Sequence, residues 1–154
     1  MYSSPVFFLS VNNLTVARYA AAMMVDYIGF CFDPSDEKFI TVAKAKEIMG
    51  WLSGVQFVGE FRNKPLDEVL AIALELNLPL VLLQDDVISS IPEGLPFKTI
   101  TVFPNTAGDY HMKENVITGA DGSIMAIAFH TGKEDETGVI DFSEITEALE
   151  KLEI

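Results

Sequence analysis

Apolar residues follow two different patterns along this chain. Short continuous apolar runs, which are typical of buried strands, predict strands over 6–11, 27–32, 55–61, 79–84, 97–103 and 123–129. Apolar residues at helical spacing predict helices over 15–25, 41–52 and 63–77, and a last helix that carries Ile145, Leu149 and Leu152. The segment 104–122 shows neither pattern, so we predict an irregular or partly hairpin structure there.

Residue types at the predicted helix starts support these elements. Thr41 is placed to cap the second helix through its side-chain oxygen. Pro65 stands in the first turn of the third helix, where Asp67 and Glu68 favour the positive end of the helix dipole.

The order of elements predicts the fold class. Strands that are apolar throughout and separated by helices indicate a parallel α/β sheet with helices on its faces and right-handed crossovers. A (β/α) barrel and an open doubly wound sheet both satisfy this order, and both place the site at the carboxyl ends of the strands. We expect one domain over residues 1–154, because this length suits a single compact core.

Composition narrows the possible partners. A formal net charge of -13 makes this an acidic protein and argues against nucleic acid and anionic membranes, which bind clustered Lys and Arg. The single cysteine, Cys31, allows no disulfide framework, and the sequence shows no signal peptide or membrane-spanning run. We therefore expect a cytoplasmic protein with a small-molecule ligand.

Polar residues follow the predicted strands, at the edge where a site would lie. They are Asn12, Asp33, Glu60, Gln84, Asp85, Asp86, Asn105 and His130. The four carboxylates among them could alternatively hold a divalent cation, although a strongly acidic surface also scatters carboxylates by chance. We assign no metal and no cofactor.

Several motifs, taken in order, resemble one enzyme family. "VNNLT" before an Ala-rich helix, "DYIGFCFDPS", "VQFVGEFRNKPLDEVLAIALELNLPLVLLQDD" and "ETGVIDFSEI" follow one another as in phosphoribosylanthranilate isomerase of tryptophan biosynthesis. The resemblance is firmest from Val11 to Asp86. It implies a (β/α)8 TIM barrel and an Amadori rearrangement, in which an acid protonates the ribose ring oxygen and a base removes the C2 proton.

Two family positions that carry this chemistry are changed here. The family's first strand ends in Lys-x-Cys-Gly with the cysteine as base, and Ser10, Asn12 and Asn13 stand at the Lys, Cys and Gly positions. An amide accepts no proton near neutral pH, so Asn12 cannot be that base. The family's acid is an aspartate after the sixth strand, where this chain has Phe129 or His130. His130 could donate a proton, because imidazole titrates in the right range.

Positions that bind substrate in the family also differ. Lys38 replaces the arginine that contacts the anthranilate carboxylate, and Gln84 with Asp85 replaces a His-Gly pair after the fourth strand. Lysine keeps the charge but lacks the bidentate guanidinium. The family's phosphate loops, after strands seven and eight, have no counterpart, and an acidic mouth would repel a phosphate.

Some of these residues also have a purely structural interpretation. Asn12 and Asn13 could simply turn the chain into the next helix, because Asn suits turns and caps. Cys31 lies within an apolar strand and is interpreted as a core residue. His111, in the polar stretch "DYHMKEN", is interpreted as a surface residue.

We therefore expect a shortened, divergent homologue of phosphoribosylanthranilate isomerase, with a truncated TIM-barrel-like sheet of about six strands. Dimerisation, which we favour, or an extra hairpin would cover the open ends. The chain would have lost isomerase activity and would serve as a small-molecule binding or interaction protein. The alternatives are an active isomerase in which His130 shares the acid and base work with Asp85 or Asp86, and a metal-dependent lyase or hydrolase. The candidate ligand-binding residues are Lys38, Asp33, Gln84, Glu60 and Asn105.

Overall fold

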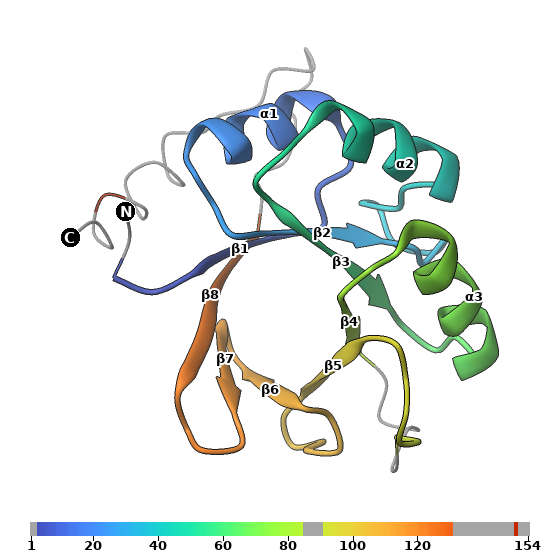
Figure 1. The fold of residues 1–154 in the computed structure, drawn as a ribbon, viewed down its shortest axis with the longest axis vertical. Helices are drawn as coiled ribbons and strands as arrows, with labels where there is room; N and C mark the ends of the chain where they lie inside the picture. Colours follow the sequence, from blue (N-terminus) through green and yellow to red (C-terminus); the bar gives the residue numbers. More distant parts are fainter. Residues whose placement is uncertain (1–2, 85–90, 131–149, 151–154) are drawn as a thin grey trace.

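In the computed structural model, the described residues 3–84, 91–130 and 150 contain eight strands that close into a barrel (Figure 1). The strands are β1 (Val6–Leu9), β2 (Tyr27–Cys31), β3 (Gln56–Phe61), β4 (Leu80–Leu83), β5 (Lys98–Val102), β6 (Tyr110–Lys113), β7 (Val116–Gly119) and β8 (Ile124–His130). The helices are α1 (Leu14–Ala22), α2 (Val42–Trp51) and α3 (Leu66–Leu76). Each strand pairs with the next one along the chain, and β8 pairs with β1 to close the barrel.

The half of the barrel from β1 to β4 has the predicted order of strands and helices. Its strands are parallel, and α1, α2 and α3 lie along the outside of this half (Figure 1). Asn13 Oδ1 accepts a hydrogen bond from the Val16 N–H at 2.9 Å and starts α1. Thr41 Oγ1 accepts from the Lys44 N–H at 3.1 Å and starts α2, so the predicted cap is confirmed.

The described helices are short. The longest, α3, has 11 residues, and none of them combines the length and apolar character that a membrane crossing requires. The predicted last helix, with Ile145, Leu149 and Leu152, lies outside the described residues.

Within the described residues 91–130, a loop connects β5 to β6, and two hairpins connect β6 to β7 and β7 to β8. β5 and β6 are parallel, β7 is antiparallel to both β6 and β8, and β8 runs parallel to β1. The predicted fold class is confirmed, with eight strands instead of about six and with an extra hairpin closing the sheet. The polar residues of the segment 104–122 gave no clear strand pattern, so β6 and β7 were not predicted as separate strands. They form a hairpin, which reverses the chain within a few residues and needs no helix between its strands.

A loop covers the outer face of β5 in place of a helix. Asp109 Oδ2 accepts hydrogen bonds from the Thr99 N–H at 2.9 Å and from the Thr99 hydroxyl at 3.1 Å. The Thr101 hydroxyl donates to the Asn105 carbonyl at 2.8 Å. Both threonines are buried, so the loop 103–109 satisfies the polar groups on this face.

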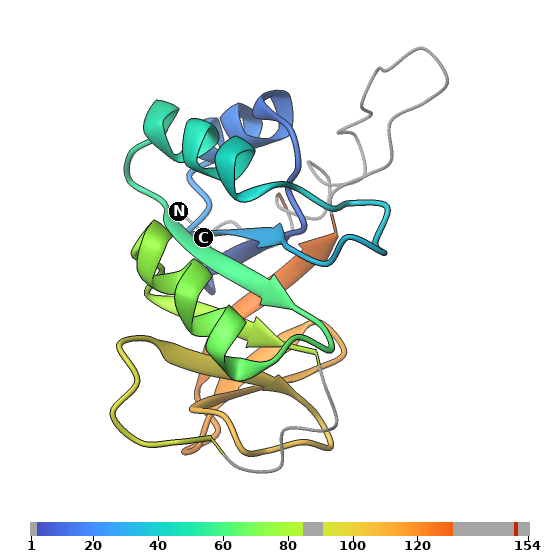
Figure 2. The same ribbon diagram turned by 90° about the vertical axis from the view of Figure 1, so that its right-hand side faces the viewer.

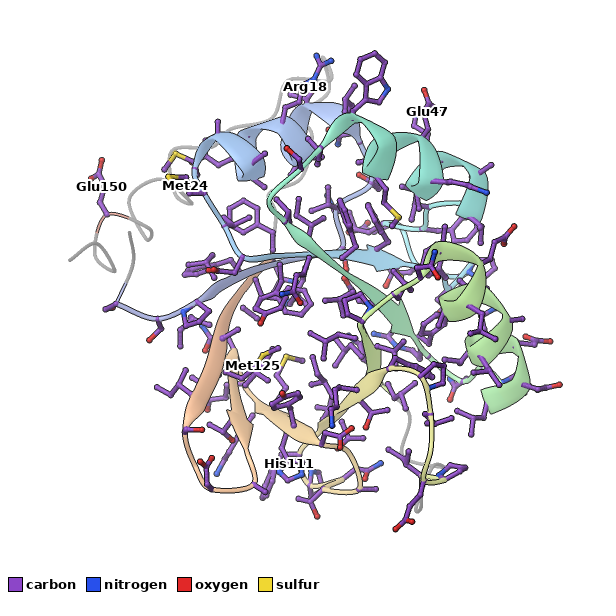
Figure 3. The ribbon with its side chains drawn as sticks, viewed as in Figure 1. Arg18, Met24, Glu47, His111, Met125 and Glu150 are labelled. Carbon is purple, nitrogen blue, oxygen red and sulfur yellow. The ribbon has the colours of Figure 1, made fainter. Side chains whose placement is uncertain are left out.

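Alternate strand residues face two separate apolar cores. The barrel interior is packed with residues that include Phe7, Val58, Leu82, Ile100 and Ile117. The layer between sheet and helices includes Phe8, Phe30, Ile48 and Val69. Side chains fill the interior, whereas those of Arg18 and Glu47 point away from the barrel (Figure 3). Burial on both faces explains why the strands of this half are apolar at consecutive positions.

The strand directions define one end of the barrel as its mouth. The arrowheads of β2, β3, β4 and β8 point toward the same end (Figure 2). Glu60, near the end of β3, is the one charged side chain that is buried among the described residues.

Candidate functional site

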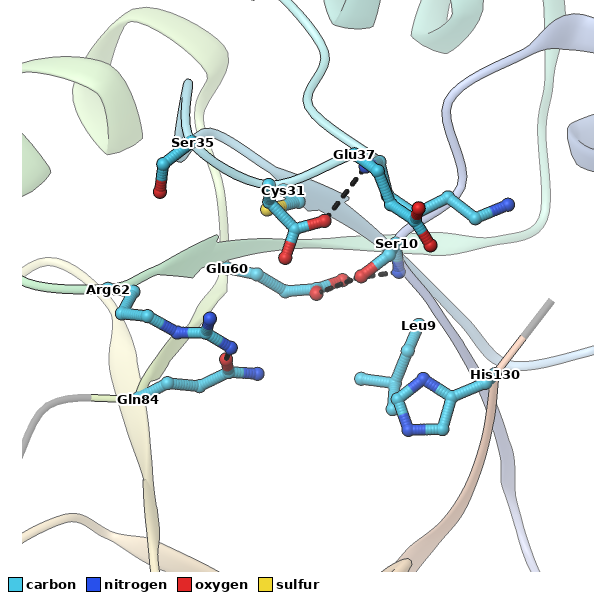
Figure 4. Close-up of a pocket in the computed structure, with 11 residues that line it drawn as sticks. Leu9, Ser10, Cys31, Ser35, Glu37, Glu60, Arg62, Gln84 and His130 are labelled. Carbon is cyan, nitrogen blue, oxygen red and sulfur yellow. Dashed lines mark hydrogen bonds between the residues drawn. The ribbon is translucent and has the colours of Figure 1, made fainter. Parts of the chain in front are cut away.

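The mouth of the barrel is hollow. A cavity of about 600 Å³ opens at the carboxyl ends of β1 to β4 and β8 (Figure 4). Its lining residues are Leu9, Ser10, Cys31, Ser35, Asp36, Glu37, Lys38, Glu60, Arg62, Gln84 and His130. An adjoining cavity of about 330 Å³ shares Leu9, Arg62, Gln84 and His130 with it and adds Val102, Met112, Glu114 and Asn115. The mouth therefore has a charged side on β1 to β4 and a more apolar side on β5 and β6.

A buried carboxyl group lies at the base of the charged side. The side chain of Glu60 is only 3% exposed. Its Oε2 accepts a hydrogen bond from the Ser10 N–H at 2.6 Å, and its Oε1 accepts one from the Ser10 hydroxyl at 2.6 Å. Ser10 directly follows β1 and has a φ of 54°, in the left-handed region that few residues other than glycine adopt. The two residues are drawn together in Figure 4.

Gly29 on β2 makes this contact possible. β2 lies between β1 and β3 in the sheet, so the Glu60 side chain must cross β2 to reach Ser10. A Cβ atom at residue 29 would collide with Glu60 Oε2 and would lie 2.9 Å from the Phe7 ring. Glycine therefore leaves the space that the carboxyl group occupies.

Burial changes the ionisation of Glu60. Desolvation raises the pKa of its carboxyl group to about 7, and the nearby charge of Asp36 acts in the same direction. The hydrogen bonds from Ser10 and the charge of Arg62 oppose this increase. In the described part of the chain no Lys or Arg forms an ion pair with Glu60. Both ionisation states are therefore accessible to Glu60 near neutral pH.

Arg62 supplies a cationic group beside this carboxyl. Its Nη2 donates to Gln84 Oε1 at 2.6 Å, which joins the ends of β3 and β4. The Arg62 side chain is exposed and faces the mouth (Figure 4). A guanidinium group held in this way is suited to bind a carboxylate or phosphate.

The structure brings four of the predicted site residues together. Lys38, Glu60, Gln84 and His130 all line the larger cavity. The grouping of Glu60, Gln84 and His130 follows from the parallel strand ends, as the sequence predicts, whereas Lys38 lies in the segment after β2 and was selected through the family resemblance. The roles that we assign to them stay predictions.

Three other predicted site residues lie away from this cavity. Asn12 is absent from its lining, and its Oδ1 accepts a hydrogen bond from Asn13 Nδ2 at 3.3 Å. Asp33 accepts two hydrogen bonds from Ser35, which lower the pKa of its carboxyl group, and it lines a separate hollow. The Asn105 side chain accepts from the Ala107 N–H at 3.0 Å within the loop after β5.

A metal site made of the acidic strand ends gains no support. Asp85 and Asp86 lie outside the described residues. Among the side chains that are described, no three His, Cys, Asp or Glu residues are grouped closely enough to hold a metal ion.

Cys31 and His111 match their structural interpretations, with one correction. Burial raises the pKa of the Cys31 thiol to about 11, so the thiol is protonated at neutral pH. His111 lies in β6 and not in a loop, and its Nε2 is 3.0 Å from the Thr106 carbonyl and 3.1 Å from the Gly108 carbonyl.

Sequence reasoning missed the roles of Ser10, Gly29 and Arg62 in the mouth. One signal was present: Glu60 is the charged residue within the otherwise apolar run "FVGEF". A carboxyl at such a position needs hydrogen-bond partners, and these could have been sought at neighbouring strand ends. The partners themselves depend on the strand register, which the sequence does not reveal.

Parallel strands with helices outside and a cavity at their carboxyl ends define a TIM-barrel-type protein, here with a hairpin-closed second half. No protein-family model matches the sequence. The chain is 32% identical over 97 residues to the N-(5'-phosphoribosyl)anthranilate isomerase of Oceanobacillus iheyensis, covering 62% of this chain and 47% of that relative.

Solved structures of the same enzyme also resemble this chain. The phosphoribosylanthranilate isomerase of Thermus thermophilus matches 64% of this chain and 51% of its own, with a TM-score of 0.57 and 25% identity. Monomers generated from the dimeric isomerase of Thermotoga maritima match 64% of this chain and 52% of their own, with a TM-score of 0.55 and 25% identity. The chain spans about half the length of these relatives. The resemblance to phosphoribosylanthranilate isomerase is therefore confirmed.

Proposed function

We propose that this chain binds a small anionic molecule in the barrel mouth and does not carry out the isomerisation of its relatives. The observation that carries the proposal is the cavity of about 600 Å³, lined by Arg62, Lys38 and Gln84 at the strand ends. Concave cavities of this size are typical of small-molecule sites, and Arg62 and Lys38 supply positive charge in this one beside the acidic residues Asp36, Glu37 and Glu60. The resemblance places the isomerase base at Asn12, an amide that does not line this cavity.

The position of the isomerase acid supports the same proposal. The resemblance places this acid at Phe129 or His130, and neither residue is a carboxylic acid. The Phe129 ring packs against Phe8, with the ring centroids 6.4 Å apart, in the core behind the sheet. Only His130 of these two lines the cavity. An isomerase built on His130 is therefore the second candidate function.

A titration with a reduced, non-rearranging analogue of phosphoribosylanthranilate tests the proposal, followed by a fluorescence assay for turnover of phosphoribosylanthranilate itself. We expect the analogue to bind without turnover of the substrate. Arg62→Ala should weaken the binding about tenfold, because a charge-assisted contact to the anion is lost. Lys46→Ala, which removes the same charge from an exposed position of α2, should leave the affinity unchanged.

Two results would contradict the proposal. Turnover that falls in His130→Ala would establish a working isomerase. Failure of the analogue to bind would exclude an anionic ligand of this class.

We also propose a homodimer and a cytoplasmic location. The described strands form a closed barrel, so the dimer no longer follows from exposed strand edges. Its support is the dimeric relative from Thermotoga maritima. Sedimentation equilibrium would measure the mass directly, and a monomer at micromolar concentration would exclude a stable dimer.

A further inference from the structure

Among the described residues, the interior of this barrel is lined mainly by apolar side chains, and Glu60 is the buried charged side chain near its mouth. Two residues before Glu60 on β3, Val58 fills the interior together with Leu82 and Ile100. An apolar residue at position 60 would continue this packing. Burying a carboxyl group there instead is unfavourable unless the group is hydrogen-bonded.

Two separate features accommodate this carboxyl. Gly29 leaves the space that it occupies. Ser10 adopts a φ of 54°, and from this conformation both its N–H and its hydroxyl reach the two carboxyl oxygens at 2.6 Å. Glu60 nevertheless lines the cavity and is not sealed behind it. This arrangement holds an ionisable group in one orientation at the base of an open pocket, which is the requirement for a group that transfers protons.

We propose that Glu60 is a general base and general acid that transfers a proton from and to a molecule bound in the mouth, and that Ser10 is the residue that positions its carboxyl group. The substrate class is a small carbon acid that carries a carbonyl or imine and an anionic group. Its apolar part would lie over Leu9, Val102 and Met112, and its anionic group would lie at Arg62. This activity is additional to ligand binding and does not depend on the relatives' substrate.

The proposed step balances without a co-reactant. The Glu60 carboxylate takes the proton from the carbon next to the carbonyl or protonated imine. The C–H electron pair forms a carbon–carbon double bond while the C=O or C=N pair moves to oxygen or nitrogen, which gives an enolate or an enamine. The protonated Glu60 then returns the proton to the same or a neighbouring atom. Arg62 lines the same cavity and would hold the anionic group of the substrate in place during both transfers.

The ionisation of Glu60 fits this role. Its pKa of about 7 leaves both the base and the acid form populated at neutral pH. The other titratable or charged groups that face the same cavity are Cys31, Asp36, Glu37, Lys38, Arg62 and His130.

The chromogenic probe 5-nitrobenzisoxazole tests the proposal. A base removes its C3 proton, the N–O bond breaks, and 2-cyano-4-nitrophenolate forms, so no other reactant is needed. We expect the wild-type chain to convert this probe about 100-fold faster than Glu60→Gln does, with a rate that increases with pH through a midpoint near 7. The control is Glu47→Gln, which removes an exposed carboxylate on α2 and should convert the probe at the wild-type rate.

Ser10→Gly tests the positioning role separately. Glycine tolerates the positive φ, so this change removes the hydroxyl without backbone strain. The hydroxyl of Ser10 donates a hydrogen bond that stabilises the ionised form of Glu60. Without this bond the pKa of Glu60 rises, so the midpoint of the pH–rate profile should move upward and the rate at pH 6 should fall. An unchanged profile would exclude the positioning role.

Other outcomes overturn the proposal itself. Equal rates for the wild type and Glu60→Gln would exclude Glu60 as the base. A rate that survives in Glu60→Gln and falls in His130→Ala would assign the base to His130. If Glu60→Gln does not fold, His130→Ala decides: a rate that persists in this variant with a midpoint near 7 supports Glu60, and a lost rate, a midpoint below 5 or no catalysis excludes it. Because the probe is not the relatives' substrate, these results are independent of the isomerase test.

Discussion

The two halves of the barrel are built in different ways and contribute different parts of the mouth. From β1 to β4, parallel strands alternate with helices that cover the outside. From β5 to β8, hairpins connect the strands from β6 onward, and a hydrogen-bonded loop covers the outer face of β5. One closed barrel therefore results from two kinds of connection, and the strand ends still meet at a common mouth.

The same division is visible in the chemistry of the mouth. The helix-covered half provides Ser10, Glu60 and Arg62, whereas the hairpin half provides the apolar Val102 and Met112 together with Glu114, Asn115 and His130. The part of this chain that resembles the isomerases is somewhat less than two thirds of its length. The comparison teaches that the buried carboxyl and its serine partner depend on the register of β1, β2 and β3, and that the opposite half adds an apolar wall and the imidazole of His130.

The largest predicted effect concerns the buried carboxyl of the helix-covered half. The folded-state pKa of Glu60 is about 7, above the ordinary value of 4.5, so the folded chain binds the extra proton between these pH values. This contribution to stability is complete below about pH 4.5 and is lost as the pH rises through about 7. It corresponds to about 3 kcal/mol in the free energy of unfolding.

Urea unfolding at several pH values, for the wild type and Glu60→Gln, measures this effect. The free energy of unfolding of the wild type should fall relative to Glu60→Gln as the pH is raised from 4.5 to 7. A constant difference across this window would mean that Glu60 is not the desolvated group that the structure indicates.

The sequence could predict the helix-covered half because its signals are strong. Its strands are buried on both faces, and its helices show apolar spacing together with caps such as Thr41. The strands β6 and β7 gave weaker signals, because each has four residues and most of these are only partly buried. Their pairing depends on contacts within a closed barrel, which local sequence does not encode.

The candidate site was predictable in part for a similar reason. Strand-end reasoning selected Glu60, Gln84 and His130, the family resemblance added Lys38, and these residues share one cavity. The Ser10–Glu60 contact joins residues 50 positions apart across an intervening strand. It requires the register of three strands and a glycine in the middle one, so pattern alone could not reveal it.

The next largest effect on stability is expected when a methyl group is added at Gly29, on the charged side of the mouth. Gly29→Ala should lower the free energy of unfolding by about 2 kcal/mol, because its Cβ would displace the Glu60 carboxyl and crowd Phe7. Gly50→Ala on α2 is the matched control, because a Cβ there meets no atom within 4 Å and alanine favours a helix. Chemical denaturation of both variants compares them, and equal stabilities would show that the space at Gly29 is not required.

The smallest effect concerns the hairpin half, where side chains replace a helix. Asp109→Ala removes the acceptor for the Thr99 N–H and hydroxyl, and should cost about 1 kcal/mol of stability. Asp109→Asn keeps a carbonyl oxygen at this position and should recover most of the loss. Asp67→Ala removes an equally exposed carboxylate from the first turn of α3 and should cost only about 0.3 kcal/mol, because the helix is held by packing. If denaturation gives the same loss for Asp109→Ala and Asp67→Ala, then the loop bonds do not hold β5, and its outer face must be stabilised by packing as in the helix-covered half.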